Sequence, residues 1–198
     1  MDCIYGIMIY DTVACSDFAG PLDVFYISNQ IVGKGRVFTI SPRPGIIECG
    51  GGLKVEADYT IETAPDLDVL LIPGAENARK GVDGKEPVVE WIRAQEKKVT
   101  YLTSVCTGAL ILQAAGVLAG RKATTHWMFT EQLSKDGRIE VLPDMRYVRD
   151  GKIVTSQGVT AGIDMALWLV GQIHSPEHAR TVQKMIHYNP APPYTAAV

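Results

Sequence analysis

Hydrophobic positions in this chain fall into two kinds of pattern that alternate along the sequence. Residues 69–72 form an unbroken aliphatic run bounded by Asp68 and Pro73, which is typical of a central strand buried on both faces. Residues 4–10 form another short apolar run, and residues 17–29 then carry apolar side chains at helical spacing. The two patterns continue in further expected strands at residues 36–41, 53–57, 99–103, 122–125, 146–149 and 153–156, and in expected helices at residues 87–97, 107–119, 127–133, 161–174 and 176–187.

Strands that alternate with helices at this spacing favour an α/β fold with a mostly parallel central sheet and helices on both faces. A hairpin-like turn is expected at the glycines of residues 50–52. The chain has 198 residues, of which 46% are hydrophobic and 21% charged, as in an ordinary globular domain. We therefore expect a single domain over residues 1–198, with residues 189–198 as a Pro-rich C-terminal tail.

Charge and hydropathy exclude several classes of partner. The net charge is −3 and the sequence contains no basic run, which argues against binding to nucleic acid or to an anionic membrane. The most apolar stretches, residues 109–120 and 161–173, are interrupted by polar residues and are shorter than a membrane span. The first residues also lack a secretory pattern. We expect a cytoplasmic protein that acts on a small molecule.

The four cysteines are Cys3, Cys15, Cys49 and Cys106. They are too few and too scattered for a disulfide framework, and they form no CxxC pair or Cys/His cluster of the kind that binds zinc. We expect four free thiols and no metal site. Cys3 and Cys49 are interpreted as small apolar residues of the core, which is the usual role of a free cysteine.

Cys106 stands out because it lies where a buried strand is expected to pass directly into a buried helix. Residues 103–109 read Thr-Ser-Val-Cys-Thr-Gly-Ala, the thiol counterpart of a nucleophile elbow, with Gly108 small enough for the tight reversal. The unpaired N–H groups at the start of a helix stabilise a thiolate and lower its pKa. The pattern therefore predicts that Cys106 is a nucleophile ionised near neutral pH.

Further motifs accompany this elbow. They are Asp17-Phe18-Ala19-Gly20-Pro21, Ile72-Pro73-Gly74, Ser104-Val105-Cys106-Thr107-Gly108-Ala109, Ala123-Thr124-Thr125-His126-Trp127, Gly158-Val159-Thr160-Ala161-Gly162-Ile163-Asp164 and Tyr188-Asn189-Pro190-Ala191-Pro192-Pro193. With these motifs the chain resembles the DJ-1/PfpI (ThiJ) superfamily over nearly its full length, and within it the isonitrile hydratase branch. The resemblance implies a flavodoxin-like three-layer sandwich, a homodimer, no metal or organic cofactor, and Cys106 as the nucleophile with Asp17 and Thr107 beside it.

The chemistry of isonitriles is consistent with an acid beside the thiol. Attack of sulfur on the isonitrile carbon requires that this carbon also gain a proton, which Asp17 could supply before acting as a base for water. A nearby thiolate and burial would both raise the pKa of Asp17. The alternative is that Asp17 is an ordinary helix N-cap. The Thr107 hydroxyl either bonds the thiolate or an intermediate, or simply begins the helix.

Five other residues are expected near the substrate. The backbone N–H groups of Gly74 and Ala75 are predicted to form an anion hole, with a plain strand-ending turn as the alternative. His126 either orients a neighbour or is a hydrogen-bonded structural histidine. Trp127 and Phe18 are expected to shape the pocket.

Two other functions remain open at this point. A carbonyl-stress or redox-sensing role of the DJ-1 type would also use an exposed cysteine of low pKa, although the relatives with that role usually have Glu where this chain has Asp17. A small-ligand-binding domain without catalysis, as in the sensor domains of AraC-type regulators, shares most of the same motifs.

Overall fold

The computed structural model describes residues 2–76 and 86–189 of the 198-residue chain. Over these residues a seven-stranded sheet forms the centre of the molecule. Its neighbouring strands follow the order β10 (Tyr147–Asp150), β11 (Ile153–Ser156), β7 (Tyr101–Val105), β6 (Val69–Ile72), β1 (Ile4–Met8), β2 (Arg36–Ser41) and β5 (Tyr59–Thr60). Neighbouring strands are parallel except β10 and β11, which form an antiparallel hairpin at one edge. The mostly parallel sheet expected from the sequence is confirmed.

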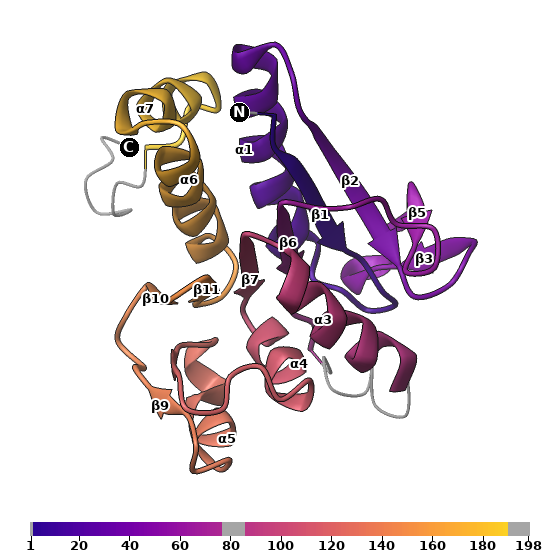
Figure 1. Ribbon diagram of the computed structural model, residues 1–198, viewed down its shortest axis with the longest axis vertical. Helices are drawn as coiled ribbons and strands as arrows, with labels where there is room; N and C mark the ends of the chain where they lie inside the picture. The colour runs from indigo at the N-terminus through magenta and orange to yellow at the C-terminus, as the bar shows by residue number, and fades with distance from the viewer. Residues whose placement is uncertain (1, 77–85, 190–198) are drawn as a thin grey trace.

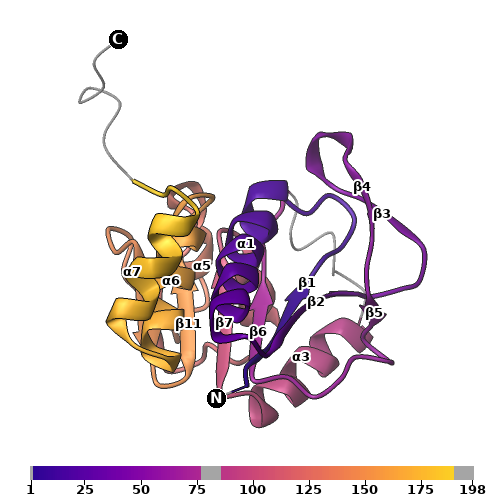
Figure 2. The ribbon, with the colours of Figure 1, turned by 90° about the horizontal axis from the view of Figure 1, so that it is seen from above.

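Helices cover both faces of this sheet (Figures 1 and 2). The described helices are α1 (Cys15–Val32), α3 (Glu86–Lys98), α4 (Gly108–Ala114), α5 (Thr130–Ser134), α6 (Ala161–Ile173) and α7 (Pro176–Met185). Helices α1, α6 and α7 pack against one another in one layer, and α4 contacts both α3 and α5 in the other. The predicted flavodoxin-like three-layer sandwich is therefore correct.

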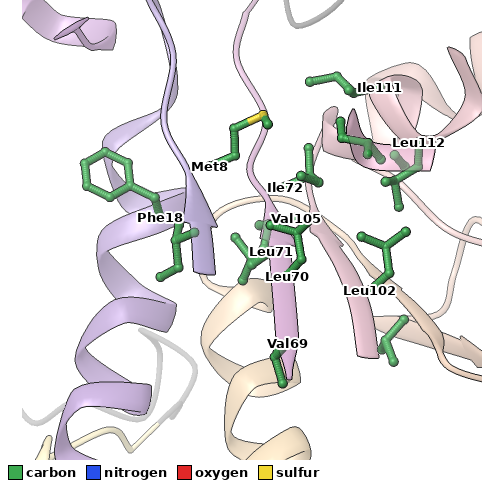
Figure 3. Packing of buried hydrophobic residues seen from close by; sticks show 14 of the residues in the cluster. Met8, Phe18, Val69, Leu70, Leu71, Ile72, Leu102, Val105, Ile111 and Leu112 are labelled. Carbon is green, nitrogen blue, oxygen red and sulfur yellow. The ribbon is translucent and has the colours of Figure 1, made fainter. Parts of the chain in front are cut away.

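The core is built around β6, the strand that the sequence marked as buried on both faces. All four of its side chains, from Val69 to Ile72, are fully buried. Figure 3 shows them between Met8 and Phe18 on one side and the α4 residues Ile111 and Leu112 on the other. Burial of one such aliphatic side chain stabilises a fold by roughly 1.5–3 kcal/mol, so this strand anchors the sheet from its middle.

Three expected elements differ from the structure. The helix predicted over residues 107–119 ends at Ala114, because Gly116 has a φ of 75° and turns the chain out of the helix. The strand predicted over residues 122–125 is only β8 (Lys122–Ala123), and it pairs with β9 (Glu140–Val141) outside the central sheet. The expected helix at residues 127–133 divides into a 3₁₀ turn, η2 (Trp127–Phe129), followed by α5.

The expected glycine turn is confirmed. Strands β3 (Ile46–Glu48) and β4 (Lys54–Glu56) form an antiparallel hairpin about a short 3₁₀ segment, η1 (Gly50–Gly52). Gly51 has a φ of 79°, which explains why glycine is suited to this turn. The Pro-rich tail expected from residue 189 onward lies, beyond Asn189, outside the described residues.

Within residues 2–76 and 86–189, none of the helices combines the length and the apolar character needed to span a bilayer.

Candidate active site

Four adjacent strands bring the candidate residues to one edge of the sheet. In the order β11, β7, β6 and β1, these strands are neighbours, and they run parallel. Val159 follows β11, Cys106 follows β7 and Gly74 follows β6, while Asp17 lies in the first turn of α1, after β1. This edge, at the carboxyl ends of parallel strands, is where α/β folds place their ligands.

Cys106 occupies a strained turn between β7 and α4. Its φ is 59°, a left-handed conformation that a residue with a Cβ adopts at a cost of about 1–3 kcal/mol. The surrounding backbone holds it there, because its N–H donates to the carbonyls of Ser156 (3.2 Å) and Gln157 (3.1 Å). Its carbonyl accepts from the Thr125 hydroxyl at 2.8 Å. These contacts give Cys106 the geometry of a nucleophile elbow.

Gly108 permits this turn to pack closely against the next strand. A Cβ at this position would lie 2.1 Å from the Ile72 carbonyl oxygen, which is an impossible contact with the backbone. Only glycine therefore lets α4 begin directly beside the end of β6, as the small residue in the motif led us to expect.

Asp17 is completely buried and is held by two backbone donors from distant parts of the chain. Its Oδ2 accepts from the Gly74 N–H at 3.0 Å, and its Oδ1 accepts from the Val159 N–H at 3.1 Å. Helix α1 begins with Ala14 as its N-cap residue, so Asp17 is not the N-cap considered as its alternative role. The Asp17 carboxyl and the Cys106 thiol also influence each other's pKa, which places them in one electrostatic environment.

Thr107 is a buried residue whose hydroxyl makes two bonds to one neighbour. It donates to the Ala75 carbonyl at 2.7 Å and accepts from the Ala75 N–H at 2.9 Å. The N–H groups of Gly74 and Ala75, which the sequence suggested as an anion hole, are therefore engaged with Asp17 and Thr107. In this structure they position the candidate side chains instead of facing the site as free donors.

The acid–base state of the pair differs from the sequence prediction. Burial, and after it the charge of Asp17, raise the pKa of Cys106 to about 12, although the N–H and hydroxyl of Thr107 oppose this rise. The prediction of a resting thiolate is thus wrong. Burial also raises the pKa of Asp17, as expected, and outweighs the opposing bonds from Gly74 and Val159. Desolvation exceeds the stabilisation that the start of a helix as short as α4 offers to a thiolate.

Of the remaining predicted residues, His126 lies near Cys106, whereas Trp127 lies at the surface. His126 is partly buried beside the site: a Cβ on Gly158 would lie 2.4 Å from its ring and 3.4 Å from the Cys106 sulfur. Its Nδ1 accepts from the Met128 N–H at 3.3 Å, so it caps η2. Trp127 is 71% exposed.

Phe18 is a nearly buried residue of the hydrophobic core. It is 7% exposed, and Figure 3 labels it among the residues of the core cluster. Its position in the first turn of α1 places it next to Asp17 in sequence, but its side chain packs with the core. The contact of Phe18 with a substrate stays a prediction.

A cavity of about 540 Å³ opens beside the pair. Asp17 and Val159 lie in its wall, whereas Cys106, which is partly exposed, is not among the lining residues. The rest of the wall comes from the start of α1 and from the β3–β4 hairpin with its neighbours: Thr12, Ala14, Cys15, Ser16, Glu48, Cys49, Gly50, Gly51, Gly52 and Glu76. Among the described residues, no group of three or more His, Cys, Asp or Glu side chains is arranged to hold a metal ion.

The sequence model of the DJ-1/PfpI family matches residues 6–172. The chain belongs to the DJ-1/PfpI family. It is 37% identical over 193 residues to an isonitrile hydratase of Pseudomonas putida, covering 96% of this chain and 80% of that protein. It is 25% identical over 185 residues to the HTH-type transcriptional regulator GbdR of Pseudomonas aeruginosa, covering 92% of this chain but only 50% of the regulator. The crystal structure of a ThiJ/PfpI family protein from Pseudomonas syringae superposes with a TM-score of 0.89 at 31% identity, covering 100% of this chain and 80% of that one.

Sequence reasoning missed several groups at the site of this DJ-1/PfpI protein. Val159 has a φ of 54° and donates its N–H to Asp17, yet nothing in the sequence singled it out from its motif. Tyr10 is fully buried, and its hydroxyl donates to the Pro73 carbonyl at 2.8 Å. The charges of Asp17 and Cys106 add to the effect of burial in raising the pKa of Tyr10, which places this phenol in the same electrostatic environment.

Proposed function

We propose that this protein hydrates isonitriles to N-substituted formamides, with Cys106 as the nucleophile and Asp17 as the group that moves protons. The observation that supports this most directly is that Cys106, in its strained turn, shares one electrostatic environment with the fully buried carboxyl of Asp17. The likeness to an isonitrile hydratase across 96% of the chain is in agreement.

The raised pKa of Cys106 determines how the first step proceeds. Because the thiol is protonated at rest, the pair supplies both parts of the addition: the sulfur bonds to the isonitrile carbon while Asp17 takes the thiol proton and passes it to that carbon. The product is a thioimidate, R–N=CH–S, on Cys106, and Asp17 is again ionised. The low dielectric of the buried site strengthens this exchange.

The second step uses one water molecule. Asp17 removes a proton from the water, the oxygen bonds to the thioimidate carbon, and the nitrogen is protonated by Asp17. The carbon–sulfur bond then breaks while the hydroxyl proton passes to the sulfur, which restores the Cys106 thiol and releases R–NH–CHO. One isonitrile and one water are consumed for each formamide, and no oxidant or reductant is needed.

The surrounding residues support this chemistry by positioning. Gly74 and Val159 hold the carboxyl of Asp17, and the bonds between Thr107 and Ala75 fix the start of α4 next to Cys106. The partly buried His126 and the exposed Trp127 remain candidates for contact with the substrate. We also propose, from family membership, a cytoplasmic homodimer.

The direct test follows formamide production from a simple isonitrile such as cyclohexyl isocyanide. We expect activity in the wild-type protein and none in Cys106→Ala, because this variant lacks the sulfur on which the thioimidate forms. Cys3→Ala is the matched control, since Cys3 is also buried but belongs to the core, and it should retain activity. Consumption of methylglyoxal without formamide production would instead indicate a carbonyl-stress enzyme, and tight binding without turnover would indicate a sensor domain.

A further inference from the structure

Two thiols outside the Cys106–Asp17 pair lie together on the wall of the 540 Å³ cavity. Cys15 is the first residue of α1, and Cys49 lies between β3 and η1. The Cys15 thiol lies against the segment that contains Cys49, because it is 3.2 Å from the carbonyl oxygen of Gly50, the residue after Cys49. All four cysteines are free in this structure, so the pair is a reduced dithiol.

The backbone on either side holds the two cysteine segments in close contact. The Thr12 N–H donates to the Glu48 carbonyl at 2.8 Å, and the Gly50 N–H donates to the Val13 carbonyl at 2.8 Å. The Cys15 thiol itself donates to the Gly50 carbonyl at 3.2 Å. A disulfide requires two Cα atoms within about 4.4–6.8 Å. The paired backbone holds the two segments side by side, and rotation about the Cα–Cβ bonds can then turn the two sulfurs toward each other.

The two sulfurs differ in their access to a reagent. Cys15 is partly exposed and faces the cavity, whereas Cys49 is only 3% exposed. Burial, together with the neighbouring Cys15, raises the pKa of Cys49 to about 11. The accessible Cys15 is therefore the sulfur that a small oxidant meets first, and Cys49 is placed to react with it afterwards.

We propose that Cys15 and Cys49 form a reversible intramolecular disulfide when a small peroxide enters the cavity. In the first step the Cys15 sulfur bonds to one peroxide oxygen, the O–O bond breaks, and Cys15 becomes a sulfenic acid with release of water. In the second step the Cys49 sulfur bonds to the Cys15 sulfur and the S–O bond breaks, which releases a second water. Two thiols and one hydrogen peroxide thus give one disulfide and two waters.

This bond would connect the start of α1 to the β3–β4 hairpin. Cys15 lies two residues before Asp17 in the same helical turn, so the modification is adjacent to the candidate catalytic carboxyl. Disulfides in reducing compartments are usually transient and serve redox sensing or catalysis. The proposal does not depend on isonitrile hydration, since it concerns only the two thiols and a peroxide.

The test uses full-length protein carrying Cys106→Ala, which prevents oxidation of that thiol from obscuring the result. After exposure to hydrogen peroxide, we expect the intact mass to fall by about 2 Da, the loss of two hydrogens, and to recover with dithiothreitol. Trypsin should then release residues 1–34 and 37–54 as one linked species, because these contain Cys15 and Cys49 respectively. Residues 1–34 also contain Cys3, so fragmentation of the linked species assigns the bond.

Cysteine variants distinguish a Cys15–Cys49 disulfide from oxidation at other cysteines. Cys15→Ser and Cys49→Ala should each abolish the mass loss, whereas Cys3→Ala should retain it. Because Cys49 is buried, circular dichroism would verify that Cys49→Ala is folded. Cys15 is partly exposed, so Cys15→Ser tests the loss of the disulfide without a risk of misfolding. Sulfinic acid on Cys15 with Cys49 unmodified, a disulfide between two chains, or mass loss that persists in Cys15→Ser would overturn the proposal.

Discussion

Asp17→Asn should separate the reactivity of the Cys106 thiol from catalysis. The charge of Asp17 is the second cause, after burial, of the high pKa of Cys106. Asparagine has nearly the same shape, but its single acceptor oxygen serves only one of the two backbone donors, Gly74 or Val159. It also carries no charge and cannot relay a proton. We therefore expect the variant to make Cys106 more reactive toward alkylating reagents while abolishing isonitrile hydration.

The magnitude follows from the pKa of Cys106, which the folded site raises from 9.0 to about 12. A nearby like charge accounts for about 1–2 pH units of such a rise, and the burial that remains keeps the pKa above 9. The thiolate fraction at neutral pH should therefore increase about 10- to 100-fold in Asp17→Asn. In both proteins the rate of alkylation should continue to increase as the pH rises from 7 to beyond 9, because the thiol is still protonated there.

The assay measures the rate of alkylation of Cys106 by iodoacetamide as a function of pH. Peptide mass spectrometry isolates this residue, since cleavage by trypsin gives residues 99–121 with Cys106 as their single cysteine. Asp23→Asn is the matched control, because it removes the same charge from an exposed position on α1. It should change neither the rate of Cys106 alkylation nor the rate of isonitrile hydration. An unchanged alkylation rate in Asp17→Asn, or full hydratase activity in that variant, would refute the reasoning.

Three further predictions concern the residues around the pair. Thr107→Val should lose about 1–3 kcal/mol of unfolding free energy in urea denaturation, since it leaves the buried Ala75 N–H without a partner, whereas Thr107→Ser should lose less; equal losses would contradict this. Gly74→Ala should abolish isonitrile hydration, because the new Cβ would lie 2.6 Å from Thr107 Oγ1 and 2.8 Å from Asp17 Oδ2. The control Gly50→Ala, whose new Cβ would have no contact under 3.4 Å, should be folded and should produce formamide. Trp127→Ala should leave stability within about 0.5 kcal/mol, as expected of a side chain 71% exposed, and should raise KM without lowering kcat if the indole contacts substrate.

The fold could be predicted where local patterns are strong. The boundaries of β2, β6 and β11 agree with those expected, because each is a short run rich in β-branched, aliphatic or aromatic residues and is bounded by polar residues or turns. The strands β5 and β9 were not predicted, since each has only two residues and shows no periodicity. The early end of α4 at Ala114 was also missed, because a glycine such as Gly116 is compatible with either a helix or its end.

The site could be located from the sequence, but its electrostatics could not. Cys106 lies in a turn formed by contiguous residues, so its position follows from a local pattern. Its pKa depends instead on burial and on Asp17, whose own partners Gly74 and Val159 lie 57 and 142 positions further along the chain. Long-range packing of this kind leaves no periodic signal, which is why the prediction of a resting thiolate failed.

The most direct test of the account is the mass of the intact protein, quenched in acid during turnover of an isonitrile. We predict a fraction of wild-type protein heavier by the mass of one isonitrile molecule, located on Cys106 by peptide mapping, and no such species in Cys106→Ala. Formamide production that persists in Cys106→Ala, or turnover in which an adduct forms on another residue, would contradict a thioimidate at this elbow.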